Sequence, residues 1–332
     1  MNRPPEEFKR ISADQLQAYA AACAKAAGMR DAHAEQLAEL LTNSDLRGVR
    51  SHGTRSLIGY CGAVKNKTVN PDPDIHIVSE TANAVHIDGD GSLGYAPTML
   101  ATEMAIVKAK ETGVGLGAAR HIGHYGSAGH YVRRAMEEGC TAFSVQGAHP
   151  QYYVDNTDKQ AAYYGNPPLC FGLPSQDEPP LVLDGATCIM ADYQHGEEFY
   201  ALQELIPAAY FKSMGYTGVG TALGGVFVGQ GNERARKMHE KWPGARLGGF
   251  VLVMRIDLFV PAAEFRHGID ALVRGVREDM EPIRGYDEAT LPGTVEHRKE
   301  EEYRREGIAM ALDTLDSLEK LGTDLGVAPP WL

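Results

Sequence analysis

Strand-like and helical segments alternate between Ile75 and Gln146, and this alternation limits the possible folds more than any other feature of the chain. Two short runs rich in β-branched and apolar residues come first, at 75–78 and 84–88. The segments after them are helical at 95–112, strand-like at 114–120, helical at 128–138 and strand-like at 141–146. Such alternation is typical of α/β proteins, so we expect a sheet covered by helices.

The flanking segments are predicted to be mainly helical. Apolar residues recur at helical spacing over 12–46, with Ser12 as the N-cap of a first helix and Gly28 as its stop. The tail from Glu296 to Leu325 has the pattern of one charged amphipathic helix that contains Gly307. Further strand patterns lie at 169–172, 181–184 and 250–254. The expected fold class is therefore α/β (mixed α+β), with helical terminal segments around a central mixed sheet.

This organisation suggests two domains. Residues 1–75 are expected to form a helical domain, joined by a carboxy-terminal helix over 296–332. Residues 76–295 are expected to form an α/β domain that binds cofactor and substrate. A connector rich in Asn, Pro and Asp lies near the boundary, at 68–73.

Composition and charge argue against several classes of function. The formal net charge of -12 disfavours a nucleic-acid partner, because affinity for a phosphate backbone depends on clustered Lys and Arg. No apolar stretch is long enough to cross a bilayer. The five cysteines lie far apart without a Cys-x-x-Cys pair, which argues against a zinc site and a disulfide framework. We expect a cytoplasmic protein that binds a small molecule and no metal.

A glycine-rich segment, Gly89–Gly94, matches the Gly-x-Gly-x-x-Gly pattern of a dinucleotide-binding turn. Two features argue against this interpretation: no acidic residue follows the next predicted strand, and Pro97 falls in the first turn of the next predicted helix. Arg120 could instead accept a 2′-phosphate. The dinucleotide-binding turn is thus kept as the minority interpretation, beside a plain glycine-rich turn.

The most informative polar cluster lies where a predicted helix ends, at Ser51–Gly53, which reads Ser-His-Gly. A histidine beside a serine hydroxyl can keep a pKa near neutrality and exchange a proton with a carbonyl or an alcohol. Three nearby arginines are candidates to bind a carboxylate: Arg47, Arg50 and Arg55. The alternative is that the serine caps the next helix and the histidine lies on the surface.

Two further histidines, His121 and His124, lie in a glycine-rich stretch between a predicted strand and a predicted helix. Backbone N–H groups at such a helix start suit an anion, and His124 could face the same substrate as His52. No carboxylate lies nearby in the sequence, which argues against a metal site. A single histidine here would more often be structural, but two at one junction favour a functional role.

Several blocks along the chain together resemble the malate/L-lactate dehydrogenase family of the second type, which includes ureidoglycolate dehydrogenase and 2,3-diketogulonate reductase. They occur in the same order over nearly the whole chain, which is far more specific than any single block. The blocks are Asp45–Gly53 (Asp-Leu-Arg-Gly-x-x-Ser-His-Gly), Tyr60, Asp88–Gly91, His124–Gly129, Gly165–Pro167, Leu181–Thr187 and Leu291–Gly293.

The resemblance implies a fold that is not a classical Rossmann fold, in which Gly89–Gly94 is a structural turn. It also implies a homodimeric oxidoreductase that uses NAD or NADP (NADH or NADPH). Such an enzyme reduces a small 2-oxo acid or a cyclic imine, or oxidises the corresponding 2-hydroxy acid. By the same resemblance, His52 is the proton donor, Ser51 its neighbour near the nicotinamide, and His124 a second polar group over the substrate.

The other expected site residues fall into two groups. Tyr60 is a substrate contact by resemblance, and Arg55, Arg47 and His121 join it as candidates from the clusters above. The resemblance places the cofactor against Gly126, Ser127, Ala128, Asp184, Ala186, Thr187, Lys212, Pro292 and Gly293. Backbone donors in these segments would hold the pyrophosphate without a large positive charge.

Departures from the family pattern leave an alternative function open. Ser56 stands where members usually have an arginine, so Arg55 is the nearest arginine. Lys212 follows Asp184 by only 28 positions, and no glycine follows this lysine directly. The polar and aromatic loop at 151–164 is either a changed substrate pocket or a drifting surface loop. The alternative is a non-redox lyase, hydratase or isomerase on the same scaffold, whereas the intact Ser-His-Gly block disfavours a purely structural protein.

Overall fold

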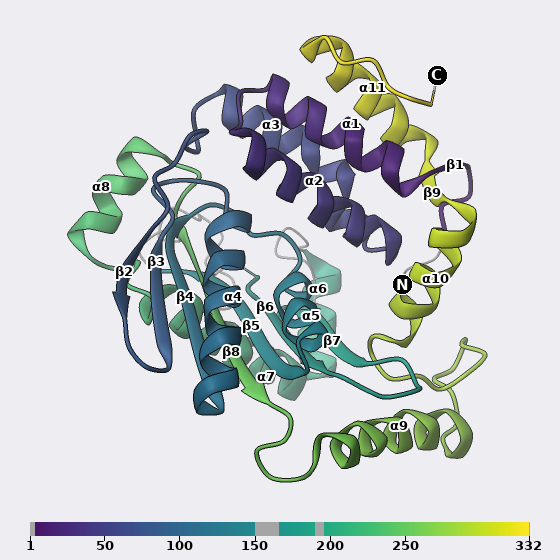
Figure 1. Ribbon diagram of the computed structural model, residues 1–332. Helices are drawn as coiled ribbons and strands as arrows, with labels where there is room; N and C mark the ends of the chain where they lie inside the picture. The colour runs from purple at the N-terminus through teal and green to yellow at the C-terminus, as the bar shows by residue number, and fades with distance from the viewer. Residues whose placement is uncertain (1–3, 150–165, 190–195, 332) are drawn as a thin grey trace. The chain divides into compact units, whose positions relative to one another are not determined.

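The computed structural model describes residues 4–149, 166–189 and 196–331 (Figure 1). The loop predicted over 151–164 lies outside the described residues. The chain divides into two compact units. Unit 1 consists of Met1–Pro73, Leu173–Val182 and Phe259–Leu332, and unit 2 consists of Asp74–Gly172 and Leu183–Leu258. The segment 259–295, which the sequence analysis grouped with the sheet, is thus part of unit 1.

Unit 1 is built from helices and a two-stranded sheet. Ser12 caps the first helix by accepting a hydrogen bond from the N–H of Gln15, as its position predicted. The strands β1 (Phe8–Ile11) and β9 (Ile308–Ala311) pair antiparallel. The helices are α1 (Ala13–Ala26), α2 (Asp31–Leu46), α3 (Leu57–Lys65), α9 (Ala262–Asp279), α10 (Thr294–Glu306) and α11 (Leu312–Leu325), with the short 3-10 helices η1 (Arg50–His52) and η2 (Thr54–Ser56).

The carboxy-terminal tail is not the single helix expected over 296–325. Helix α10 ends at Glu306 because Gly307 has φ 87° and ψ 154°, outside the helical region. The next four residues form β9, whose register places Ile308 opposite Ile11, and both side chains are buried. Helical periodicity in the tail gave no sign of this break, since the strand partner lies near the other end of the sequence.

Unit 2 contains a seven-stranded mixed sheet, which confirms the predicted fold class. The strand order is β2-β3-β4-β8-β5-β6-β7. The strands are β2 (His76–Glu80), β3 (Ala84–Asp88), β4 (Val114–Ile122), β5 (Cys140–Ala148), β6 (Pro168–Leu173), β7 (Leu181–Ala186) and β8 (Leu247–Arg255). The helices are α4 (Tyr95–Thr112), α5 (Gly129–Glu137), α6 (Glu197–Leu205), α7 (Pro207–Thr221) and α8 (Glu233–Lys241), with a π-helical turn η4 (Ala222–Val226).

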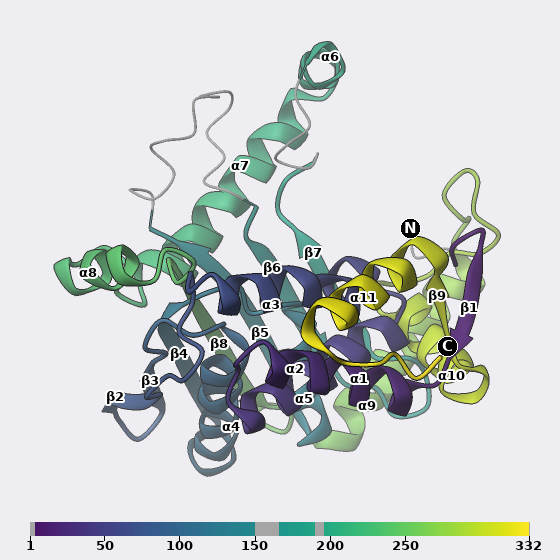
Figure 2. The same ribbon diagram turned by 90° about the horizontal axis from the view of Figure 1, so that it is seen from above.

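Both faces of the sheet in unit 2 pack against helices. Helix α4 covers β3 and β4, and this packing buries Val85, Ile87, Ala101, Ala119 and Ile122. A second buried cluster joins β5, β8 and the residues after η4. Helices α6 and α7 extend away from the sheet (Figure 2). In the described part of the chain, no helix is both long and apolar enough to span a membrane.

The glycine-rich turn at 89–94 does not belong to a doubly wound parallel sheet, because β8 lies between β4 and β5 and is antiparallel to both. A Cβ on Gly94 would lie 2.7 Å from the carbonyl oxygen of Gly123, and one on Gly91 would lie 2.2 Å from the ring of Trp242. The glycines thus let the turn pack against protein atoms. The interpretation as a classical dinucleotide-binding turn is wrong.

Candidate functional site

The Ser-His-Gly turn follows α2 in unit 1 and is built from η1 and η2. The Oγ of Ser51 lies 2.9 Å from Nδ1 of His52, and the Ser56 hydroxyl donates a hydrogen bond to the carbonyl of Ser51. Ser51 is exposed and His52 is half-buried. Ser51 does not cap the next helix, because the N-cap residues of η2 and α3 are Gly53 and Ser56, and neither helix has a side-chain cap. A serine and a histidine side chain thus form a hydrogen-bonded pair at the protein surface.

A buried carboxylate, Asp45, holds this turn in place. Its Oδ2 accepts hydrogen bonds from the backbone N–H and the hydroxyl of Thr54, at 2.8 and 2.6 Å. A Cβ on Gly53 would lie 1.8 Å from Oδ1 of Asp45, so only glycine fits beside the carboxylate. Burial raises the pKa of Asp45 to about 7, although the Thr54 hydrogen bonds partly oppose that rise. The residue after His52 is therefore fixed by side-chain packing and not only by local backbone bonds.

Asp45 was not singled out as a site residue, although it opens the Asp45–Gly53 block. The available signal was an acidic residue next to Leu46, in the last turn of a helix whose other buried positions are mostly apolar. Such a carboxylate needs hydrogen-bond donors when it is buried. The two donors on Thr54 supply that need.

The two candidate arginines of the substrate group have different surroundings. Arg47 is mostly buried, its Nε lies 2.9 Å from Oε2 of Glu300, and its Nη1 donates to the carbonyl of Asn43. Arg55 is exposed and forms no hydrogen bond or ion pair with any described residue. Tyr60, on α3, is buried. Arg55 is thus the more accessible cation for a substrate carboxylate.

His124 precedes the start of α5 in unit 2, and its hydrogen bonding sets its tautomer. Nδ1 accepts a hydrogen bond from the N–H of Gly126, so the neutral ring carries its proton on Nε2. Gln146 fixes the same turn, because its side chain accepts from the N–H of Tyr125 and donates to the carbonyl of Gly123. The half-buried ring of His124 is therefore held by a rigid backbone.

His121 has a different environment from His124. It is completely buried with φ 54°, and its Nδ1 lies 3.0 and 3.1 Å from the two oxygens of Asp88. Arg120 and Arg234 also contact this carboxylate, at 3.2 and 3.0 Å. Burial alone would raise the pKa of Asp88, but the His121 hydrogen bond and the Arg120 charge help to lower it overall. His121 and Arg120 thus have an internal partner, and nothing in this packing gives His121 a path to substrate.

The predicted cofactor segments of unit 2 come together around the start of α5. Oδ2 of Asp184 accepts hydrogen bonds from the Ser127 hydroxyl and from the N–H of Gly129, both residues close to Gly126 and Ala128. The Asp184 carboxylate thus takes the place at this helix start that was expected for a ligand anion. An incoming phosphate would have to bind beside it.

A second pair of predicted segments meets at the end of β7. The Ser213 hydroxyl donates to the carbonyl of Thr187, and the Thr187 hydroxyl donates to the carbonyl of Pro167. These bonds tie the end of β7 beyond Ala186 to α7, which carries the exposed Lys212. Lys212 has no ion-pair partner among the described residues. Lys212 is therefore an exposed lysine on a helix that is tied to the end of β7.

Pro292 and Gly293 lie in unit 1 at the start of α10. Gly293 has φ 100°, and a Cβ there would lie 2.5 Å from the carbonyl oxygen of Pro180. The carbonyl of Pro292 accepts a hydrogen bond from the N–H of Val182. The Pro-Gly pair thus lies against the segment that leads into β7, with Pro292 itself exposed.

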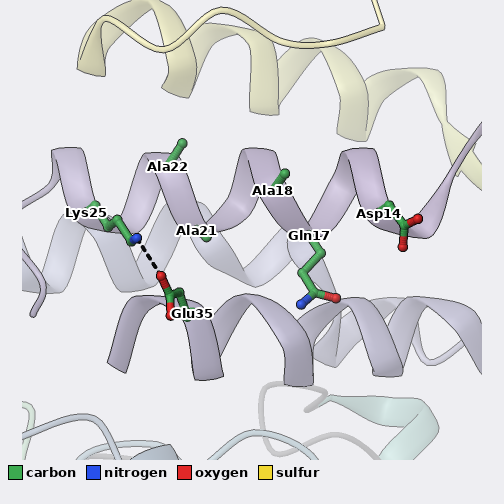
Figure 3. Close-up of a pocket in the computed structure, with 7 residues that line it drawn as sticks. All are labelled: Asp14, Gln17, Ala18, Ala21, Ala22, Lys25 and Glu35. Atoms are coloured by element: carbon green, nitrogen blue, oxygen red, sulfur yellow. Dashed lines mark hydrogen bonds and ion pairs between the residues drawn. The ribbon is translucent and has the colours of Figure 1, made fainter. Parts of the chain in front are cut away.

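Two other features of unit 1 are less suited to catalysis. A surface groove on α1 and α2 is lined by alanines and by the Lys25–Glu35 ion pair (Figure 3). Asp177, His267 and Asp270 have metal-ligand atoms within 4.8 Å of one another. Asp270, however, already accepts N–H bonds from the backbone of 176–178. Neither feature adds a proton donor beside His52.

Comparison with known proteins shows similarity over nearly the whole chain. A family model described as malate/L-lactate dehydrogenase matches residues 11–197 and 194–319. The chain is 28% identical over 305 residues to a malate dehydrogenase from Pyrococcus horikoshii, covering 82% of this chain and 83% of the relative. It is 26% identical over 353 residues to L-sulfolactate dehydrogenase from Methanocaldococcus jannaschii, covering 97% of both chains. The solved malate dehydrogenase from Pyrococcus horikoshii OT3 has a TM-score of 0.84 at 25% identity, covering 98% of each chain.

Proposed function

The chain belongs to the malate/L-lactate dehydrogenase family, and from this premise we propose that it reduces a small 2-oxo acid or a cyclic imine, or oxidises the matching 2-hydroxy acid. The family is one of NAD(P)-dependent dehydrogenases, which favours redox chemistry over the lyase, hydratase or isomerase alternative. A bound nicotinamide would supply or accept the hydride. The observation that carries the proposal is the Ser51–His52 pair on a turn held by Asp45.

His52 is the proposed proton donor. In the protonated ring, Nδ1–H donates to the Ser51 hydroxyl, so the Nε2 proton is the one that passes to the substrate oxygen or nitrogen. In the oxidation direction the same hydrogen bond keeps the proton on Nδ1 and leaves Nε2 as the base. Ser51 therefore selects which nitrogen exchanges the proton.

Two further groups have proposed roles at the substrate. The Nε2–H of His124, whose tautomer is set by Gly126, is a donor suited to a substrate carbonyl. Arg55 is suited to the carboxylate because it is exposed and has no described ion-pair partner. His52 belongs to unit 1 and His124 to unit 2, and each proposed role rests on hydrogen bonds within its own unit.

The residues present fit a nicotinamide dinucleotide in charge and accessibility. Lys212 supplies a positive charge for a pyrophosphate, and exposed Ala186 lies next to Thr187, which is tied to α7. Asp184 and Ser127 would orient the start of α5 beside the ligand. Pro292 and Gly293 would orient the start of α10 in the same way. Either NAD or NADP is compatible with these groups.

Titration of the purified full-length protein with NADH and NADPH tests the cofactor half of the proposal. Fluorescence or calorimetry is expected to show saturable binding of at least one of them. A panel of 2-oxo acids and cyclic imines then tests turnover. A folded protein that binds neither nucleotide would overturn the oxidoreductase proposal for this chain.

The His52→Ala variant tests the proton-transfer half. We expect kcat to fall by about 100- to 10,000-fold, the range typical of a lost general acid, while nucleotide affinity stays unchanged. The exposed His76 of β2 is a matched control, and His76→Ala should retain full activity. An active His52→Ala variant would refute the role given to this histidine.

A further inference from the structure

Unit 1 contains a group of three side chains of the types that bind transition metals. Asp177 lies between β6 and β7, whereas His267 and Asp270 belong to α9. Each of the three offers one ligand atom, and these atoms lie within 4.8 Å of one another. All three residues belong to unit 1. The imidazole distinguishes this group from an ordinary surface cluster of acidic residues, because imidazole is a ligand that Zn²⁺ and its neighbours among the metals prefer.

Helical spacing places two of the ligands on the same face of α9. His267 and Asp270 are three positions apart, and side chains at this spacing are neighbours on a helix surface. Asp177 comes from a segment 90 positions before His267. Sequence spacing does not reveal such a group, since the expectation of no metal rested on the cysteines and on histidines elsewhere. The three ligands come together only when the chain is folded.

Backbone N–H groups fix the carboxylate of Asp270, which is 3% exposed. Its Oδ1 accepts from the N–H groups of Gln176, Asp177 and Glu178, at 3.0, 3.2 and 3.1 Å. Its Oδ2 accepts only from the N–H of Asp177, at 3.2 Å, and keeps a lone pair for a cation. These bonds explain why Asp270 is buried. They do not require a histidine beside it, so the position of His267 calls for another cause.

The charges around the group favour a dication. Two carboxylates that lie close together repel one another unless a cation compensates them. His267 forms no hydrogen bond or ion pair with any described residue, so both ring nitrogens are accessible as ligands. Arg274 and Arg277 follow on α9, but they pair with Glu178, at 3.3 and 2.7 Å. These arginines therefore neutralise a different carboxylate.

We propose that Asp177, His267 and Asp270 bind one Zn²⁺ ion. Three atoms with mutual distances of at most 4.8 Å share a point within about 2.8 Å of each, and Zn²⁺ binds imidazole and carboxylate at about 2.0–2.2 Å. Asp177 and His267 are exposed, so rotation of their side chains supplies the difference. Mg²⁺ and Ca²⁺ prefer oxygen ligands alone, which favours Zn²⁺ here. The ion would tie the segment before β7 to α9.

Titration of the purified full-length protein with Zn²⁺, after chelator treatment and without nucleotide, tests the site without any measure of activity. Calorimetry is expected to show saturable binding. His267→Gln and Asp177→Asn should each weaken it by more than the roughly 10- to 100-fold loss that follows removal of an outer-shell partner. His297→Gln is the matched control, since this histidine also lies beside a carboxylate, 3.8 Å from Glu301 on α10, and its loss should leave binding unchanged. A wild type that does not bind Zn²⁺, or a His267→Gln variant that binds it as tightly, overturns the proposal.

Thermal denaturation gives a second readout that does not depend on counting ions. An ion that binds only the folded protein raises its Tm by mass action. We expect Zn²⁺ to raise the Tm of the wild type and of His297→Gln, but not that of His267→Gln. Asp270 stays unchanged in these variants, because its loss would leave the N–H groups of 176–178 without their acceptor. An equal rise with Mg²⁺, or an equal rise with Zn²⁺ in His267→Gln, contradicts ligation by the imidazole.

Discussion

The turn after His52 and the start of α5 use the same hydrogen-bond arrangement in opposite environments. In each, one carboxylate oxygen accepts a backbone N–H and a hydroxyl: Asp45 from Thr54, and Asp184 from Gly129 and Ser127. Asp45 is buried, whereas Asp184 is exposed. At the surface, water can replace a lost donor to the carboxylate. A buried carboxylate needs both protein donors, because leaving a buried polar group without a hydrogen bond lowers the stability of the fold. Burial therefore decides how strongly each turn depends on its carboxylate.

Removing each carboxylate gives the largest expected contrast. Asp45→Ala leaves two buried donors on Thr54 without acceptors, so we expect the free energy of unfolding to fall by about 2–4 kcal/mol. Asp184→Ala removes a cap at a helix start that water can reach, and should cost about 1 kcal/mol or less. Urea denaturation of both variants measures the difference. Equal losses would show that burial does not separate the two turns.

The pH dependence of stability gives a smaller but more specific contrast. The folded-state pKa of Asp45 is raised to about 7, against an ordinary value of 3.8. Its contribution is thus fully present below about pH 4 and is lost as the pH rises towards 7. In Asp45→Asn, which keeps an acceptor oxygen but cannot ionise, this loss should disappear, so the variant gains stability relative to wild type between pH 4 and 7. Parallel stability curves for the two proteins would contradict the raised pKa.

The hydroxyl donors give the smallest contrast. Thr54→Val removes one of the two bonds to buried Asp45 and should cost about 1–2 kcal/mol, because the carboxylate has no water to replace it. Ser127→Ala at the exposed turn should change the free energy of unfolding by about 0.5 kcal/mol or less. Thermal denaturation resolves the two effects. A larger loss for Ser127→Ala would reverse the order that burial predicts.

Local patterns predicted the regular elements well, because these depend on neighbouring residues. The helix expected at 95–112 is α4 with the same bounds. The strand expected at 84–88 coincides with β3, and the strand expected at 250–254 lies within β8. The break at Gly307 was not predictable in this way. It depends on pairing with β1, whose residues are distant in the sequence. Sequence periodicity reports the local face of a helix and not the partner that ends it.

The candidate site shows the same division. The Ser51–His52 pair was predictable, since its two residues are adjacent and form one hydrogen bond. The role of Asp45 in holding Gly53 depends on burial that only the fold creates. His121 looked as accessible as His124 in the sequence, but its ring is buried against Asp88. Burial, more than residue type, separated the structural groups from the exposed ones.

The pairing of β1 with β9 has a consequence for biosynthesis. At roughly 5–20 residues per second, the ribosome needs about 15–60 s to add the residues between Phe8–Ile11 and Ile308–Ala311. Unit 2 ends at Leu258, so all its strands emerge while β1 still lacks its partner. The nascent chain must therefore keep an unpaired strand from aggregating for most of translation. The short length of β1 and the lysine and arginine within it suit a strand that waits in solvent.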